Sequence, residues 1–70
     1  MYISDKAMLD AIGSGTRSTR TLMREFYPDA REWMKHDYMV RIARKLKVME
    51  AHGLVTREKR YNMNYWKVVE

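Results

Sequence analysis

The 70-residue chain contains no cysteine. Disulfide-held scaffolds and zinc sites built from thiolates are therefore excluded. A domain of this size buries only about 60% of the surface that its unfolded chain exposes, so its fold must rest on a small packed core. The length leaves no room for a Rossmann sheet or a (β/α)₈ barrel. We expect a single domain over residues 1–70.

Long apolar runs are also missing. No stretch approaches the roughly 18 apolar residues that a membrane span needs. The first residues lack the basic and then apolar pattern of a signal peptide. We therefore expect no membrane association. The lack of cysteine fits a reducing compartment, so the expected location is cytoplasmic.

Residue patterns typical of catalysis or metal binding are absent as well. The two histidines, His36 and His52, are sixteen residues apart, and the chain has no cysteine to complete a metal site. No nucleophile has a base at a recognisable spacing, and Gly13–Gly15 lacks the lysine pattern of a phosphate-binding loop. The sequence thus predicts no enzyme, no metal and no cofactor.

What the chain does have is an excess of basic residues. It carries 14 Lys and Arg against nine Asp and Glu, for a net charge of +5. Residues 1–35 hold six basic and five acidic groups, whereas residues 36–70 hold eight and four. A basic half indicates a polyanionic partner, although a charge of this size also serves solubility alone.

Apolar spacing predicts two helices in the first part of the chain. Ser4 caps the first and Gly13 ends it. The second begins at Thr16 or Ser18, either of which suits a cap, and ends before Pro28, which donates no backbone hydrogen bond. The expected core positions share one face of each helix: Met8, Leu9 and Ile12 in the first, and Thr19, Leu22, Met23 and Phe26 in the second.

The longest helix is predicted over about residues 37–52. Asp37 is its expected N-cap, and Gly53 stands where a left-handed C-terminal residue is needed. A short extra helix over about residues 29–35 precedes it. The expected buried positions are Trp33 and Met34 in the short helix, and Met39, Ile42, Ala43, Leu46 and Met49 in the long one.

After Gly53 the apolar period changes from helical to alternating. Residues 54–57 and 65–69 are rich in strand-forming side chains, and the polar segment 58–64 separates them. This pattern predicts a β-hairpin with a basic tip, with Trp66 in the core. The expected fold class is α+β, mainly α with a small β-hairpin.

Three apolar residues stand eleven, seven and four positions before Gly53, and a strand-forming Leu54–Val55 follows it. The three are Ile42, Leu46 and Met49. Together with three helices followed by a hairpin, this pattern resembles the winged helix-turn-helix family. The segments Leu22–Phe26 and Tyr65–Val68 are similar to the second helix and the returning wing strand of that family.

One interval departs from the family pattern. Phe26 and Ile42 are sixteen residues apart, whereas family members join the second helix to the recognition helix by a turn of a few residues. The extra piece, Pro28 to Lys35, would change how the second helix sits against a DNA groove.

The resemblance implies a small stand-alone protein that binds duplex DNA, most simply a transcriptional regulator of a prokaryote or of its virus or plasmid. The helix over about 37–52 would enter the major groove, and the hairpin over 54–69 would be a basic wing. The expected DNA contacts are Tyr38, Arg41, Arg44 and Lys45 on the helix, Arg57, Lys59 and Arg60 on the wing, and Thr16, Arg17 and Arg20 as a phosphate site at the start of the second helix.

A protein–protein interaction module is the alternative, because fold does not fix function. Its exposed anchors would be Trp33, Met34, Tyr38 and Tyr61. RNA binding through the same basic residues is a third hypothesis. Salt separates these classes, because phosphate binding weakens steeply as salt rises and an apolar contact hardly responds.

Sequence-specific control by so small a module would need a homodimer. Three surfaces are candidates for the contact between the two copies. They are the first helix, the Trp33–Met34 segment, and the outer hairpin face with Tyr65 and Val69.

Overall fold

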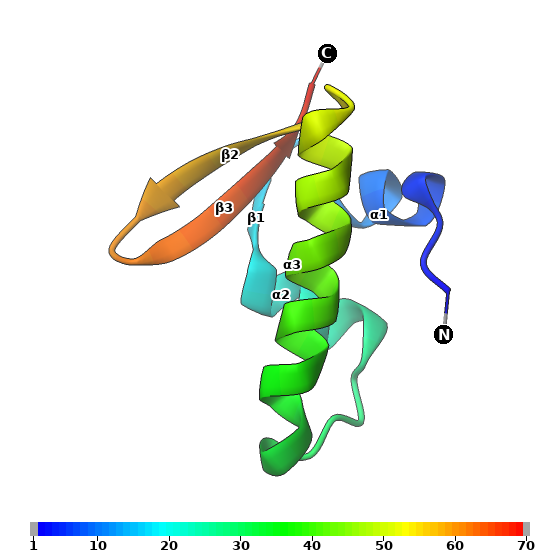
Figure 1. The fold of residues 1–70 in the computed structure, drawn as a ribbon, viewed down its shortest axis with the longest axis vertical. Coiled ribbons are helices and arrows are strands. Elements are labelled where there is room, and N and C mark those ends of the chain that lie inside the picture. The colour runs from blue at the N-terminus through cyan, green and yellow to red at the C-terminus, as the bar shows by residue number, and fades with distance from the viewer. Residues whose placement is uncertain (1, 70) are drawn as a thin grey trace.

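A computed structural model of the chain describes residues 2–69. Within them, three α-helices and one 3-10 turn pack with a three-stranded antiparallel sheet (Figure 1). The predicted α+β class is therefore confirmed. None of the described helices is long and apolar enough to cross a membrane. The elements in chain order are α1 (Asp5–Ile12), β1 (Thr16–Ser18), α2 (Thr19–Phe26), η1 (Glu32–Met34), α3 (Lys35–Ala51), β2 (Val55–Arg60) and β3 (Met63–Val68).

Serine caps begin both short helices, as predicted. The Oγ of Ser4 accepts a hydrogen bond from the backbone N–H of Ala7 at 3.0 Å, and that of Ser18 accepts one from Thr21 at 3.1 Å. Each bond satisfies one of the backbone donors left free at a helix start. Gly13 ends α1 with φ of 68°, a left-handed value that glycine adopts without steric penalty.

The residues before α2 form a strand, not the helix start that the sequence suggested. In β1, Thr16 lies opposite Lys67 and Arg17 opposite Trp66, both in β3. Thr16 is therefore no helix cap, and neither Thr16 nor Arg17 belongs to a helix N-terminus. Three residues are too few to show the alternating apolar pattern of a strand in the sequence. The strand forms because the edge of β3 offers backbone hydrogen-bonding groups.

The long helix begins two residues before Asp37, at Lys35. Met34 occupies the N-cap position without a side-chain hydrogen bond, and Asp37 lies in the first turn. The predicted helix over 29–35 is reduced to the single 3-10 turn η1, which runs directly into α3. A single 3-10 turn has little surface that can pack against the core. Trp33 is accordingly 76% exposed, and its predicted burial was wrong.

Gly53 ends α3 as predicted, in a Schellman arrangement. With φ of 74°, Gly53 donates its N–H to the carbonyl of Glu50 at 3.0 Å, and Leu54 donates to that of Met49 at 2.9 Å. These two bonds satisfy carbonyls that the helix end would leave free. The chain then turns back, so that β2 runs beside α3.

The hairpin is longer and tighter than predicted. β2 and β3 continue through the polar segment expected to be a loop, and Arg60 pairs with Met63 across a two-residue turn. The turn residues, Tyr61 and Asn62, have φ of 49° and 66°. Two consecutive left-handed residues are typical of a type I′ turn, whose twist matches that of the strands it joins.

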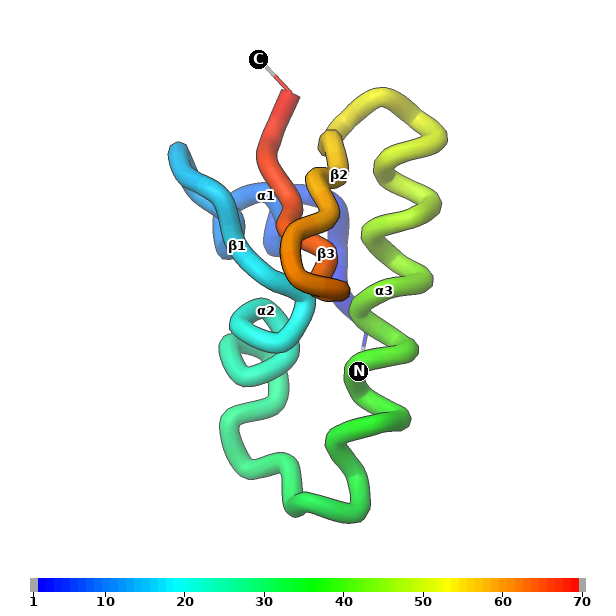
Figure 2. Tube along the Cα trace, turned by 90° about the vertical axis from the view of Figure 1, so that its left-hand side faces the viewer, coloured from blue at the N-terminus to red at the C-terminus, as the bar shows by residue number. Residues whose placement is uncertain are grey.

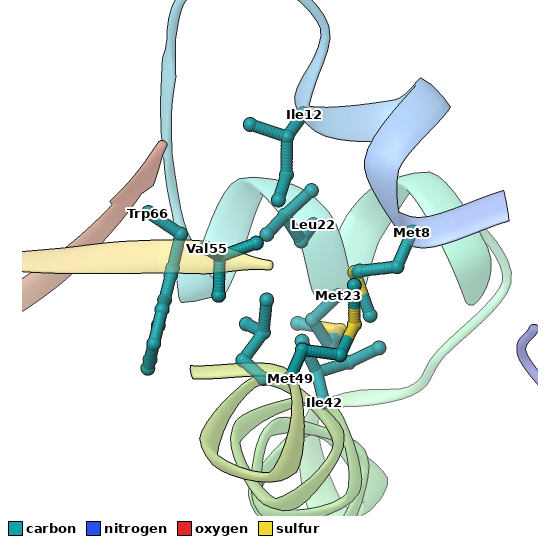
Figure 3. Packing of buried hydrophobic residues seen from close by; sticks show 9 residues of the cluster. Met8, Ile12, Leu22, Met23, Ile42, Met49, Val55 and Trp66 are labelled. Carbon is teal, nitrogen blue, oxygen red and sulfur yellow. The ribbon is translucent and has the colours of Figure 1, made fainter. Parts of the chain in front are cut away.

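One core joins all the major elements. Side chains from the three helices converge on the sheet, as Figure 3 shows. The predicted core positions Leu9, Phe26 and Met39 are only half-buried and pack at the margin of this cluster, and Ala43 is half-buried as well. The fully buried apolar residues are Met8, Ile12, Leu22, Met23, Ile42, Leu46, Met49, Val55 and Trp66.

The largest core side chain also carries the buried polar contact. Trp66 is fully buried, as predicted, and its Nε1–H donates to Thr19 Oγ1 at 2.8 Å. The Thr19 hydroxyl in turn donates to the carbonyl of Asn64 at 3.5 Å. Since Thr19 is the first residue of α2 and Trp66 lies in β3, these bonds fix the start of α2 against the hairpin.

We expect Thr19→Val to destabilise the fold by about 1–3 kcal/mol, because it leaves the buried indole N–H without an acceptor. Urea unfolding followed by tryptophan fluorescence measures the loss. Thr19→Ser is the matched control: it keeps the hydroxyl and should lose less. Equal stability of the valine variant and the parent would contradict the role given to this bond.

Candidate nucleic-acid interface

A groove separates α3 from the hairpin tip. In Figure 2 the hairpin points toward the viewer and lies between β1 and α3, above α2. The hollow there has a volume of about 310 Å³. Three elements form it, and we call it the α3–hairpin groove. Its lining comprises Thr19 and Arg20 from α2, His36, Met39, Val40 and Ala43 from α3, and Asn62, Met63 and Asn64 from the hairpin.

The groove identifies the side of α3 that faces the hairpin. Val40 and Ala43 line it, and Lys47 follows Ala43 by four residues, so it lies on the same side of the helix. Lys47 is exposed and makes no ion pair within residues 2–69. Sequence reasoning missed it. The sequence gives the helical period of α3, but it does not show along which side of the helix the hairpin lies.

Most of the α3 residues predicted to contact DNA lie on the flank of the helix away from the hairpin. The Tyr38 ring stacks on Tyr27 with centroids 4.1 Å apart and planes 6° apart, and the Arg41 guanidinium lies 5.7 Å from the Tyr38 centroid. Lys45 forms an ion pair with Asp5 of α1. Tyr38 and Lys45 are therefore engaged in contacts that hold α3 to its neighbours.

A second hollow, of about 280 Å³, gathers the α3 cations near the N-terminal segment. Arg44 lines it but is exposed, and it falls on the solvent ridge between the two flanks of the helix. The predicted set Arg41, Arg44 and Lys45 is thus brought together around one hollow, with Arg41 and Lys45 on the flank away from the hairpin and Arg44 on the ridge. The remaining lining residues are Tyr2, Ile3 and Tyr27.

The strand register sorts the basic residues of the hairpin by face. Arg57 lies opposite Trp66 and Lys59 opposite Asn64, so both project from the sheet face that carries the buried indole. Arg57 Nε lies 3.7 Å from Glu50 Oε2 of α3. Lys59 makes no ion pair among the described residues, so on this face of β2 it is the cation available to a ligand.

Arg60 belongs to the opposite face. Its Nη2 donates to Glu58 Oε2 at 2.8 Å, and its guanidinium lies 5.8 Å from the Tyr65 ring. The hydrogen bond lowers the pKa of the Glu58 carboxyl and raises the pKa of Arg60, so both stay charged near neutral pH. A carboxylate beside Arg60 reduces its attraction for a phosphate.

The three residues predicted as a phosphate site are separated. Arg20 lies in the first turn of α2 and lines the α3–hairpin groove. Thr16 and Arg17 are exposed on the edge strand β1. The neighbouring Ser18 is buried, and its hydroxyl caps α2. Of the three, only Arg20 stands at the groove.

Ion pairing therefore divides the basic residues into two groups. Lys6, Lys35, Lys45, Arg57 and Arg60 pair with carboxylates. The other nine make no ion pair within residues 2–69, and Arg20, Lys47 and Lys59 among them come from the three elements that form the groove. The full unpaired set is Arg17, Arg20, Arg24, Arg31, Arg41, Arg44, Lys47, Lys59 and Lys67.

The anchors of the alternative protein-docking hypothesis do not gather in one patch. Trp33 and Tyr61 are exposed, but they lie in η1 and in the hairpin turn. Met34 is half-buried, and Tyr38 packs on Tyr27. No described group of three or more histidine, aspartate or glutamate side chains could hold a metal ion.

Comparison of the chain with protein-family models, with curated proteins and with solved structures finds no match in any of the three. Function must therefore be inferred from the chemistry of the interface itself.

We expect Arg60→Gln to raise the pKa of Glu58 toward its ordinary value, because the hydrogen bond and charge that lower it are lost. A carbon-detected NMR titration of the Glu58 carboxyl measures this. Arg57→Gln is the matched control, since Arg57 projects from the other sheet face and should leave that pKa unchanged. In the parent, the pair persists above the lowered pKa and is lost as pH falls through it. Equal titration of Glu58 in the parent and in Arg60→Gln would contradict the pairing.

Proposed function

We propose that this protein binds duplex DNA as a winged helix-turn-helix domain and acts in transcription regulation. The element order supports this: helix, strand, two helices and a C-terminal hairpin, with sheet order β1-β3-β2. The hairpin stands beside the long helix as a wing stands beside a recognition helix (Figures 1 and 2).

The observation that carries the proposal is the distribution of free cations around the α3–hairpin groove. Arg20 lines the groove, Lys47 and Lys59 lie on the α3 and hairpin elements that flank it, and none of the three forms an ion pair among the described residues. A concave surface rimmed by unpaired positive charge attracts a polyanion and concentrates it there. Backbone phosphates follow one another along both edges of a DNA groove, so cations from separate elements can each meet one.

The dimensions of α3 suit a major-groove reader. With 17 residues it is about 26 Å long, and the major groove of B-DNA admits one α-helix. Its outward side presents His36, Val40, Arg44 and Lys47, a mixture of donors and apolar contacts that base edges accept. Lys59 on β2 and Arg20 at the start of α2 would then meet phosphates on either side.

The long interval before Ile42 fits this arrangement. Its residues form the Tyr27–Arg31 connection, the η1 turn and the first two turns of α3. The insertion therefore lengthens the N-terminal half of the long helix, and it leaves the side next to the hairpin uncovered. His36 in that added part lines the groove.

The proposed DNA contacts therefore differ from those expected from the sequence. Arg20, Arg44 and Lys59 remain as proposed contacts, and Lys47 and His36 join them. Tyr38, Arg41 and Lys45 lie on the far flank, while Arg57 and Arg60 hold carboxylates that a phosphate would have to displace. One such module covers a short site, so a regulator would bind as two copies.

A protein-docking module is the second candidate. The observation that favours it is Trp33, which is 76% exposed although tryptophan is among the residues most often used as binding anchors. On this reading the free cations serve solubility, and nucleic-acid binding is absent at physiological salt.

Two lysines on opposite flanks of α3 test the proposal directly. Lys47→Ala should lower affinity for a labelled duplex and reduce the slope of log affinity against log salt by about one, because one phosphate contact is lost. Lys45→Ala removes the same charge from the flank where Lys45 pairs with Asp5, and should leave the slope close to that of the parent. Fluorescence anisotropy over a salt series measures both.

Two results would contradict the proposal. Binding that is absent, or insensitive to salt, would remove duplex DNA as the partner and favour docking through Trp33. A larger effect of Lys45→Ala than of Lys47→Ala would retain DNA binding but move the contact surface to the α1 flank.

A further inference from the structure

The hairpin turn contains a residue that its backbone does not favour. Tyr61 and Asn62 both adopt left-handed φ, at 49° and 66°. Asparagine and glycine are common at such positions, because a short side chain or none avoids the clash with the backbone. Asn62 fits this rule and Tyr61 does not. A bulky aromatic side chain thus stands where it weakens the turn.

The fold gains nothing visible from the Tyr61 ring. It is 97% exposed, the highest value among the exposed large hydrophobic residues described. The other four tyrosines each face a partner: Tyr27 and Tyr38 stack on each other, Tyr65 lies under Arg60, and Tyr2 lies near the Lys45 ammonium. An unfavourable residue with no packing in the folded protein calls for a contact outside it.

The surroundings of Tyr61 specify what that contact is. Lys59, two residues before it, makes no ion pair among the described residues, and Asn62, directly after it, lines the α3–hairpin groove. An exposed ring between a free cation and an amide suits a ligand that combines a flat unsaturated face with negative charge. A nucleotide has both, since its base stacks on an aromatic ring and its phosphate meets a lysine.

We propose that Tyr61 stacks on a nucleobase that is locally unstacked within duplex DNA. This rests on the proposed function, because α3 and Lys59 would hold the duplex that the ring reaches. In an intact duplex both faces of each base are covered by its neighbours. The ring therefore needs a bulge, a mismatch or another interruption of stacking, and gives the protein a preference for such sites.

The test uses two labelled duplexes. They differ only in that one strand of the second carries one extra, unpaired 2-aminopurine. The parent should bind the bulged duplex about tenfold more tightly than the intact one, the scale of one base–aromatic stack. It should also quench the 2-aminopurine fluorescence. Tyr61→Phe should keep both effects, because the ring and not the hydroxyl makes the contact.

Tyr61→Asn separates binding from folding. Asparagine accepts the left-handed φ better than tyrosine, so this variant should unfold at a temperature at least as high as the parent. It should nevertheless lose the preference for the bulge and the quenching. Tyr2→Asn is the matched control, since it removes another exposed tyrosine ring, 85% exposed on the segment before α1, and should retain both effects.

The possible failures are distinguishable. If the parent binds both duplexes equally, or if Tyr61→Asn keeps the preference, stacking by Tyr61 is overturned while duplex binding stands. If the parent binds neither duplex in a salt-dependent way, the proposed function itself has failed and the inference falls with it.

Discussion

The buried hydrogen bond between Trp66 and Thr19 is the constraint on which the rest of the interface depends. The indole is fully buried in the core, and its N–H must find an acceptor there. Thr19 supplies that acceptor from the first turn of α2, and so places Arg20 beside the hairpin. The same hydroxyl donates to Asn64, whose backbone belongs to the other wall of the groove. Two walls of the surface groove are thus positioned by one buried tryptophan.

Ion pairing then determines which charges remain available on that framework. Lys45 binds Asp5 and ties α3 to α1, and Arg57 lies close to Glu50 and ties the hairpin to α3. Such partly exposed pairs add little stability each, but they occupy the cations they use. Lys47 and Lys59, each two residues from a paired cation along the chain, form no ion pair among the described residues and keep their charge for a ligand. The acidic residues therefore shape the basic surface as much as the basic residues do.

Local signals made much of the fold predictable. The serine cap of α2 and the glycine end of α3 act within a few residues of chain, and the apolar period of each helix marked its buried face. The errors fall where distant contacts decide. β1 exists only because β3 lies beside it. The start of α3 has no side-chain cap to announce it, and Trp33 is exposed because no element covers η1.

The candidate site was less predictable than the fold for a geometric reason. Helical spacing places Arg41, Arg44 and Lys45 off the buried face of α3, but it does not tell one flank from the other. That choice belongs to the hairpin, which the turn at Gly53 directs along the side of Val40 and Ala43. Tyr61 is different, because its left-handed φ in the type I′ turn is unfavourable for its own side chain before any partner is considered. Features that depend on one element can be found in a sequence, whereas a surface shared by three elements emerges only when the core has brought them together.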